Sequence, residues 1–158
     1  MRIHPLFAAP LTLAISLAPN PLSTTPNARA EGFSLLVGNR GATTTDVPDA
    51  VRGLKLIYVS KGNTEMVIET LGFGIGKRAS LKSGLHFSGG GAFTYEPQSG
   101  AAGPALTGAL AYDLLCLGTC ITAEFTQQIG YNVLPRASWV RRPVFSTFAF
   151  RMGVSAWW

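Results

Sequence analysis

Charged residues are scarce in this chain of 158 residues: they make up 13% of it, against about a quarter of an average water-soluble domain. Because 47% of the residues are apolar, the chain is not of the highly charged, apolar-poor kind that stays disordered. Two cysteines are too few for a disulfide scaffold, and the 18 glycines do not recur at every third residue as in collagen. Beyond the first thirty residues, no uninterrupted apolar run approaches the roughly 20 residues of a transmembrane helix. The composition therefore indicates a membrane protein without a spanning helix.

Residues 1–30 have the pattern of a secretory signal peptide. A short basic start is followed by the apolar stretch Leu6–Ala18, by prolines and by the small-residue site Ala28-Arg29-Ala30. We expect export and cleavage near the end of that site, which leaves one domain at 31–158. The alternative is an uncleaved N-terminal anchor, but the prolines and the short apolar core disfavour it. The net charge of +5 falls further on cleavage and is too small and too scattered to predict binding to nucleic acid.

The rest of the chain predicts an all-β domain. It has no heptad or other helical repeat, and Gly, Pro, Asn, Asp or Ser interrupts it at strand-like intervals. Several apolar segments exceed ten residues, whereas strands of globular proteins usually have five or six. The seven predicted strands are Gly32–Gly38, Gly53–Ser60, Glu65–Gly76, Gly84–Tyr95, Ala105–Leu115, Ile121–Asn132 and Phe145–Trp158.

The last segment shows the alternation of a strand most clearly. Apolar side chains stand at every second residue from Phe148 to Trp158, and the positions between them are mostly small or polar. Such a strand has one face in an apolar phase and the other in a narrow polar space. Segments 84–95, 105–115 and 121–132 repeat this pattern.

Alternation alone does not distinguish a membrane barrel from a soluble sandwich, because both hide one face of the sheet. Three details favour the barrel. The faces opposite the apolar rows carry Gly, Ala, Ser and Thr with few charges, which suits a tight lumen. The chain also ends within a long apolar strand, which would be an aggregation-prone edge unless barrel closure paired it with the first strand. Aromatic residues lie near segment ends, as in the girdles at membrane interfaces: Tyr58, Phe93, Tyr95, Tyr112, Tyr131, Trp157 and Trp158.

A signal peptide followed by amphipathic strands, the last ending in an aromatic residue, resembles the small monomeric outer-membrane β-barrels of Gram-negative bacteria. The resemblance implies an up-and-down antiparallel transmembrane β-barrel, usually of eight strands. It also implies a monomer in the bacterial outer membrane, surrounded by lipid and lipopolysaccharide, whose last strand is read by the barrel-assembly machinery. The residues that carry this assembly signal are Phe148, Phe150, Met152, Val154 and Trp158.

Seven segments leave one strand of the expected eight to be found. It lies either in 132–144, with Trp139-Val140-Arg141 as its core, or in 42–51. Barrels of this family begin and end in the periplasm. The turn between Cys116 and Cys120 therefore faces the outside in the first case and the periplasm in the second, and we favour the first.

Cys116 and Cys120 flank a three-residue link at the predicted tip of a hairpin. Cross-strand positions bring Cα atoms into disulfide range and an exported protein meets an oxidising compartment, so we predict a disulfide. The alternative is a pair of free thiols. A metal site is disfavoured, because no second ligand cluster accompanies the pair.

His86 and Ser88 are the candidate catalytic residues. They share one face of a predicted strand, and a hydrolase needs a hydroxyl nucleophile beside an imidazole base. The pair is similar to the His-x-Ser motif of the outer-membrane lipid A deacylases, but the carboxylate is not at that family's spacing and the pair faces the lumen. We favour the alternative, a lumen histidine that is hydrogen-bonded to its neighbours.

Four charged residues have inward parity and are expected to form a paired network, because an isolated charge in a low-dielectric interior is costly. They are Lys55, Asp113, Glu124 and Arg151. A lumen filled in this way is a plug rather than a pore. Glu69 has the outward parity of Leu71 and Phe73, which conflicts with exposure to lipid unless a bulge shifts the phase.

Arg136, Arg141 and Arg142 form a basic cluster near Trp139. On an outer loop they would contact the phosphates of lipopolysaccharide, and the alternative is a solvated loop. Three functions follow from these patterns: a structural or surface-interacting outer-membrane barrel, an outer-membrane lipid hydrolase using His86 and Ser88, and a soluble periplasmic barrel that binds a small apolar ligand. We favour the first, without cofactor, metal or nucleic-acid partner.

Overall fold

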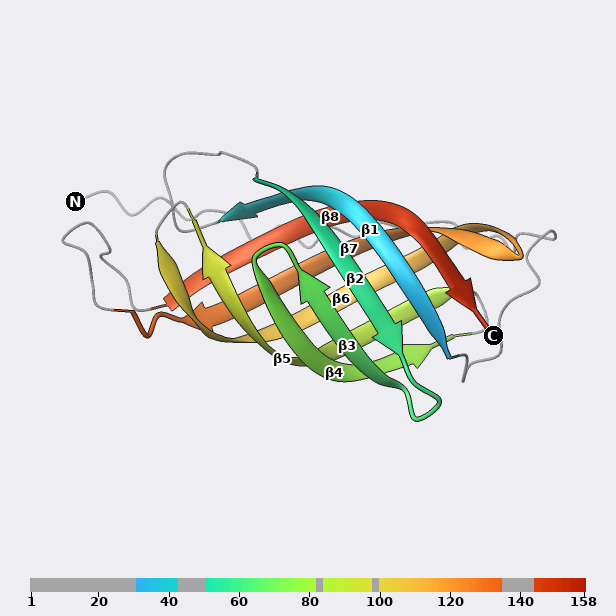
Figure 1. Ribbon diagram of the computed structural model, residues 1–158, viewed down its shortest axis with the longest axis horizontal. Coiled ribbons are helices and arrows are strands. Elements are labelled where there is room, and N and C mark those ends of the chain that lie inside the picture. Colours follow the sequence, from blue (N-terminus) through green and yellow to red (C-terminus); the bar gives the residue numbers. More distant parts are fainter. Residues whose placement is uncertain (1–30, 43–50, 82–83, 98–99, 135–143) are drawn as a thin grey trace, which may run out of the picture.

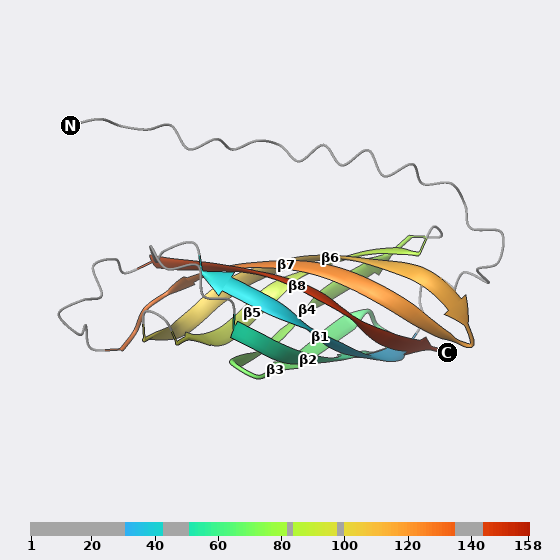
Figure 2. The same ribbon diagram turned by 90° about the horizontal axis from the view of Figure 1, so that it is seen from above.

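The computed structural model describes residues 31–42, 51–81, 84–97, 100–134 and 144–158 (Figure 1). They form a closed antiparallel barrel in which strands follow one another in chain order and the last pairs with the first. The strands run obliquely along the long axis of the barrel (Figure 2). The described residues contain no helix long and apolar enough to cross a membrane. The strands are β1 (Gly32–Ala42), β2 (Val51–Val59), β3 (Thr64–Glu69), β4 (Gly72–Ser80), β5 (Leu85–Glu96), β6 (Ala101–Leu117), β7 (Thr119–Tyr131) and β8 (Val144–Trp157).

The predicted all-β, up-and-down barrel of eight strands is confirmed, but the prediction for the eighth strand is wrong. The expected single strand 65–76 is two strands, β3 and β4, joined by the two-residue turn Thr70-Leu71. Glu69 pairs with Gly72 across this turn, so both face the lumen, and the conflict over Glu69 disappears. A tight hairpin is hard to detect here because its turn has only two residues, neither of them Gly or Pro. Most of both alternative locations, 43–50 and 135–143, lies outside the described residues.

This extra hairpin also corrects the expected position of the cysteine turn. The β6–β7 turn lies at the same end of the barrel as the two termini of the sheet, where the backbone N–H of Trp158 donates to the carbonyl oxygen of Glu31 over 2.8 Å. Cys120 is paired with Ser155, three residues from the end of the chain. The expectation that favoured the opposite end is therefore wrong, because the additional strand precedes this turn instead of following it.

The two faces of the sheet have opposite polarity. Large apolar side chains cover the outer face of every strand, and several are more than half exposed, among them Phe73 at 64%, Leu106 at 76% and Phe150 at 55%. Most charged side chains of the strands point inward and are almost fully buried, as Lys55 at 2% and Glu124 at 1% exposure illustrate, whereas Arg52 and Lys77, near strand ends, are exposed. The alternation read from the sequence thus separates an apolar exterior from a polar lumen.

Glycine forms much of the inner wall where β4 meets β5. Gly76 and Gly90 stand opposite each other in this pair, and a Cβ atom on Gly90 would overlap with the carbonyl oxygen of Ile75. Gly91, the next residue, faces outward, and a Cβ atom added to it would have no other atom within 4 Å. The two backbones therefore approach closely only on the inner side, where glycine lets the sheet bend.

We predict that Gly90→Ala destabilises the barrel by about 1–3 kcal/mol or prevents its folding, because the methyl group overlaps with a backbone atom that cannot move freely. Gly91→Ala is the matched control and should leave the stability unchanged or raise it by about 0.4–1 kcal/mol through the unfolded state. Urea titration of the purified barrel measures both. Equal stability of the two variants would contradict the close approach of the strands.

Candidate functional site

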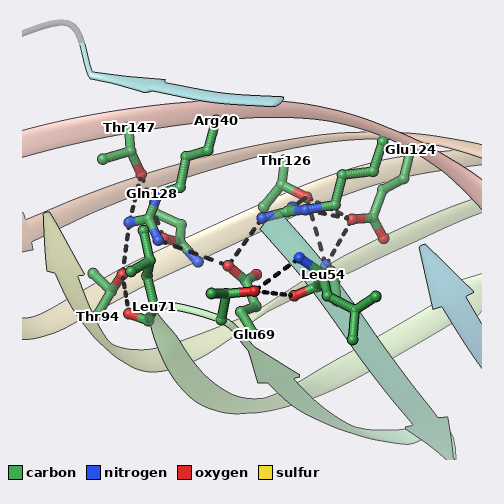
Figure 3. A network of polar contacts seen from close by, with 12 residues as sticks. Arg40, Leu54, Glu69, Leu71, Thr94, Glu124, Thr126, Gln128 and Thr147 are labelled. Carbon is green, nitrogen blue, oxygen red and sulfur yellow. Dashed lines mark hydrogen bonds and ion pairs between the residues drawn. The ribbon is translucent and has the colours of Figure 1, made fainter. Parts of the chain in front are cut away.

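A chain of ion pairs crosses the lumen (Figure 3). Lys55 of β2 contacts Glu124 of β7, with 2.7 Å between Nζ and Oε1. Arg151 of β8 lies 3.0 Å from Oε2 of Glu69 on β3 and 3.8 Å from Oε1 of Glu124. Arg40 of β1 completes the group at 3.8 Å from Glu69. Two carboxylates are thus held by three cations. Only the contact between Arg151 and Glu124 joins neighbouring strands, β7 and β8, while the other three ion pairs cross the lumen.

Hydroxyl groups form further hydrogen bonds with the charged residues of this network. Thr126 donates to Glu124 over 2.7 Å. Arg40 donates to the Thr94 hydroxyl over 2.6 Å and to the Thr147 hydroxyl over 3.2 Å. The lumen cavity beside the network, lined in part by Lys55 and Glu69, measures about 20 Å³, close to the space of one water molecule. Side chains therefore fill this part of the barrel.

The structure brings together three of the four charges that were expected to pair, Lys55, Glu124 and Arg151, and places Asp113 elsewhere. Sequence reasoning missed Arg40 and Glu69. Arg40 has the inward parity of β1 but lies two residues beyond the predicted end of that strand. A longer predicted first strand would have included Arg40. The lumen position of Glu69 could be predicted only with the β3–β4 turn in place.

Asp113 belongs to a second polar cluster, nearer the end of the barrel that holds the termini. Its Oδ1 accepts a 2.6 Å hydrogen bond from the Thr122 hydroxyl, and its Oδ2 accepts one of 3.1 Å from Nε1 of Trp157. Nε2 of His86 lies 2.8 Å from the same Oδ2, and Nδ1 of His86 lies 2.8 Å from Oγ of Ser80. A hydroxyl, an imidazole and a carboxylate are therefore linked in sequence.

The hydroxyl beside His86 is that of Ser80, and within the described part of the chain no hydrogen bond joins Ser88 to His86. Ser80 and His86 are directly paired across β4 and β5, and such partners lie about 4.5–5.5 Å apart. Residues two apart along one strand are separated by roughly 6.6 Å. Ser88 faces the same lumen but lines the cavity beside Lys55. Ser88 faces the lumen as predicted, but the serine that lies beside His86 is Ser80, its partner on the neighbouring strand.

Arg78 and Trp157 complete this second cluster. The Arg78 guanidinium carbon lies 4.7 Å from the centroid of the Trp157 ring, which is 5.3 Å from that of His86. Nη1 of Arg78 is 3.3 Å from Glu65, whereas Nε and Nη2 are buried without a hydrogen-bond partner among the described residues. Trp157 thus faces the lumen, unlike the interfacial position expected from its place near a strand end.

Cys116 and Cys120 face each other across the β6–β7 turn with their sulfur atoms at the disulfide distance of 2.05 Å. An irregularity in β6 between Asp113 and Leu115 turns Cys116 to the same face as Asp113. The two sulfurs and an oxygen of Asp113 lie within 4.8 Å of one another. This group has the ligand types of a metal site only when the cysteines are reduced, because sulfurs bonded to each other do not act as thiolates.

The basic cluster Arg136, Arg141 and Arg142 lies outside the described residues, as does the signal segment 1–30. Comparisons with family models, curated proteins and solved structures find no match to this chain. The function of the candidate sites must therefore be inferred from their geometry alone.

We predict that Arg151→Ala lowers the free energy of unfolding by about 3–5 kcal/mol, because it leaves Glu69 and Glu124 buried with fewer cations. Lys61→Ala is the control, since Lys61 is 88% exposed and its 4.0 Å contact with Glu31 is solvated. Denaturant titration of both variants should show a large loss for the first and almost none for the second. An unchanged Arg151→Ala barrel would mean that these ion pairs do not stabilise it.

Proposed function

We propose that the protein is an outer-membrane β-barrel with a narrow, side-chain-filled interior and a structural or surface-interacting role. The observation that carries this proposal is the polarity of the barrel. Apolar side chains such as Leu106 and Phe73 are exposed around the outside, while charged ones such as Lys55 and Glu124 are buried inside. Water-soluble proteins distribute these residue types in the opposite way, and a barrel surrounded by lipid requires this one.

The same polarity weighs against a soluble barrel that binds a small apolar ligand. Such a protein needs an apolar cavity inside and a polar surface outside. Among the described residues the largest buried apolar side chains of the lumen are a small cluster of Leu36, Ile57 and Val59 and the separate Phe145, and ion pairs occupy the space across the barrel. Barrel closure also leaves no free strand edge between β1 and β8, which supports a monomer.

The last strand supports the proposed recognition by the barrel-assembly machinery. It is paired on both sides, with β7 and β1, and presents its alternate apolar side chains outward. The exposed residues are Phe148, Phe150, Met152, Val154 and Trp158. In this proposal residues 1–30 direct export, after which β8 directs insertion.

The two ends of the barrel have different roles in this proposal. The end with the termini and the β6–β7 disulfide faces the periplasm, as in the barrels that the chain resembles. Tyr131 and Val144, the strand ends that flank 135–143, are paired at the opposite end of the barrel. We therefore propose that the basic cluster Arg136, Arg141 and Arg142 binds lipopolysaccharide on the outer side of the membrane.

We expect the protein to sediment with the outer membrane and to require detergent for extraction, because its outer face is apolar. Cell fractionation followed by gel electrophoresis of unheated and heated samples tests this, since a folded barrel of this kind migrates differently from the unfolded chain. Recovery in the soluble periplasmic fraction without detergent would refute the membrane location.

Orientation is tested by single cysteines at the two ends. Pro97 is exposed after β5 at the end opposite the termini, and Lys61 is exposed in the β2–β3 turn at the end with the termini. A membrane-impermeant maleimide should label Pro97→Cys in intact cells and Lys61→Cys only after the membrane is opened. Native cysteines do not interfere while their disulfide is intact. The reverse labelling pattern would overturn the orientation.

A further inference from the structure

We propose that Ser80, His86 and Asp113 form an acyl-transfer centre that accepts carboxylic esters, with the Ser80 hydroxyl as the nucleophile. This inference does not depend on the membrane location, because it rests on contacts within the barrel. The two contacts that define it are equal in length, 2.8 Å from Ser80 to His86 and 2.8 Å from His86 to Asp113.

The carboxylate decides where the imidazole carries its proton. Asp113 can only accept hydrogen bonds when ionised, so Nε2 of a neutral His86 must carry the proton that it donates to Oδ2. Nδ1 then has a free lone pair, and it is this atom that lies beside Oγ of Ser80. The serine hydroxyl therefore donates to an acceptor that is ready to take its proton, as general-base catalysis requires.

Asp113 is a positioning residue that is itself held in place. The Thr122 hydroxyl and the Trp157 indole donate to its two oxygens, so the carboxylate keeps its orientation toward His86. The ring of Trp157 also packs beside the imidazole at 5.3 Å between centroids. These contacts fix both the position and the tautomer of the base.

Arg78 supplies the group that would stabilise the developing negative charge. It faces the lumen from the same strand as Ser80, two residues earlier, and its side chain is 2% exposed. Its Nε and Nη2 atoms have no hydrogen-bond partner among the described residues, although Nη1 contacts Glu65. A buried cation with unused donors, on the strand of Ser80 and over the indole ring that packs beside His86, is suited to an oxyanion.

The proposed step is conventional acyl transfer. Oγ of Ser80 forms a bond to the ester carbonyl carbon while its proton passes to Nδ1 of His86, and the carbonyl electron pair moves onto oxygen beside Arg78. Collapse of this intermediate breaks the bond to the alcohol oxygen, which leaves with the proton from His86. Water then hydrolyses the serine ester by the same route. Ser80 is half-buried at the last position of β4, so a slender ester would enter from the end of the barrel with the termini.

The test is labelling of the folded barrel with a fluorophosphonate probe, with the modified residue identified by mass spectrometry. Wild type should carry the adduct on Ser80, Ser80→Ala should carry none, and Ser88→Ala should react as wild type. His86→Gln should slow labelling at least ~100-fold, because the base is lost. Hydrolysis of p-nitrophenyl butyrate should follow the same order.

Gel migration of unheated samples verifies that each variant is folded before it is labelled. If Ser80→Ala does not fold, the residue that carries the adduct in wild type identifies the nucleophile. Asp113→Glu should retain more labelling than Asp113→Asn, since only a carboxylate selects the required tautomer. Absence of an adduct on folded wild type, an adduct on Ser88 instead, or equal rates for wild type and His86→Gln would overturn the proposal. Equal labelling of the two Asp113 variants would contradict the role of the carboxylate.

Discussion

The charges that this barrel encloses must find partners inside it, because the closed sheet separates them from water. Lys55 and Glu124 meet across the lumen at 2.7 Å, and Arg151 connects that pair to Glu69. Lys55 and Glu69 are paired on the neighbouring strands β2 and β3, and Glu124 and Arg151 on β7 and β8, so the ion pairs join two opposite walls of the barrel. The inward glycines of β4 and β5 contribute no side chains and leave the lumen volume to this network.

The same constraint connects the fold to its proposed location. Each strand directs every second side chain inward, so a polar lumen leaves the apolar half of the sequence on the outside. A barrel with this surface is unstable in water unless lipid or detergent covers it. The low charge content of the chain has its origin here, since the lumen of a small barrel holds only as many charges as it can pair.

Two polar centres in the described part of the lumen differ in their chemistry. In the central network, the carboxylates of Glu69 and Glu124 are bound by cations, an arrangement that stabilises the walls. In the cluster of His86 and Asp113, the carboxylate instead orients an imidazole toward a hydroxyl. The first arrangement explains how charges are accommodated in the barrel, and the second is the one that has the groups for a reaction.

The sequence by itself determined the all-β class, the alternation of faces and the lumen position of Lys55, Glu124, Arg151 and His86, because the period of two is a local property of a strand. It did not reveal the β3–β4 turn, which has only two residues and neither Gly nor Pro, and so it left Glu69 on the wrong face. Nor did it identify Ser80 as the partner of His86 or separate Asp113 from the central charges. Only the tertiary structure decided these contacts, because they depend on the register between strands and on barrel closure, which bring together residues that local patterns cannot relate.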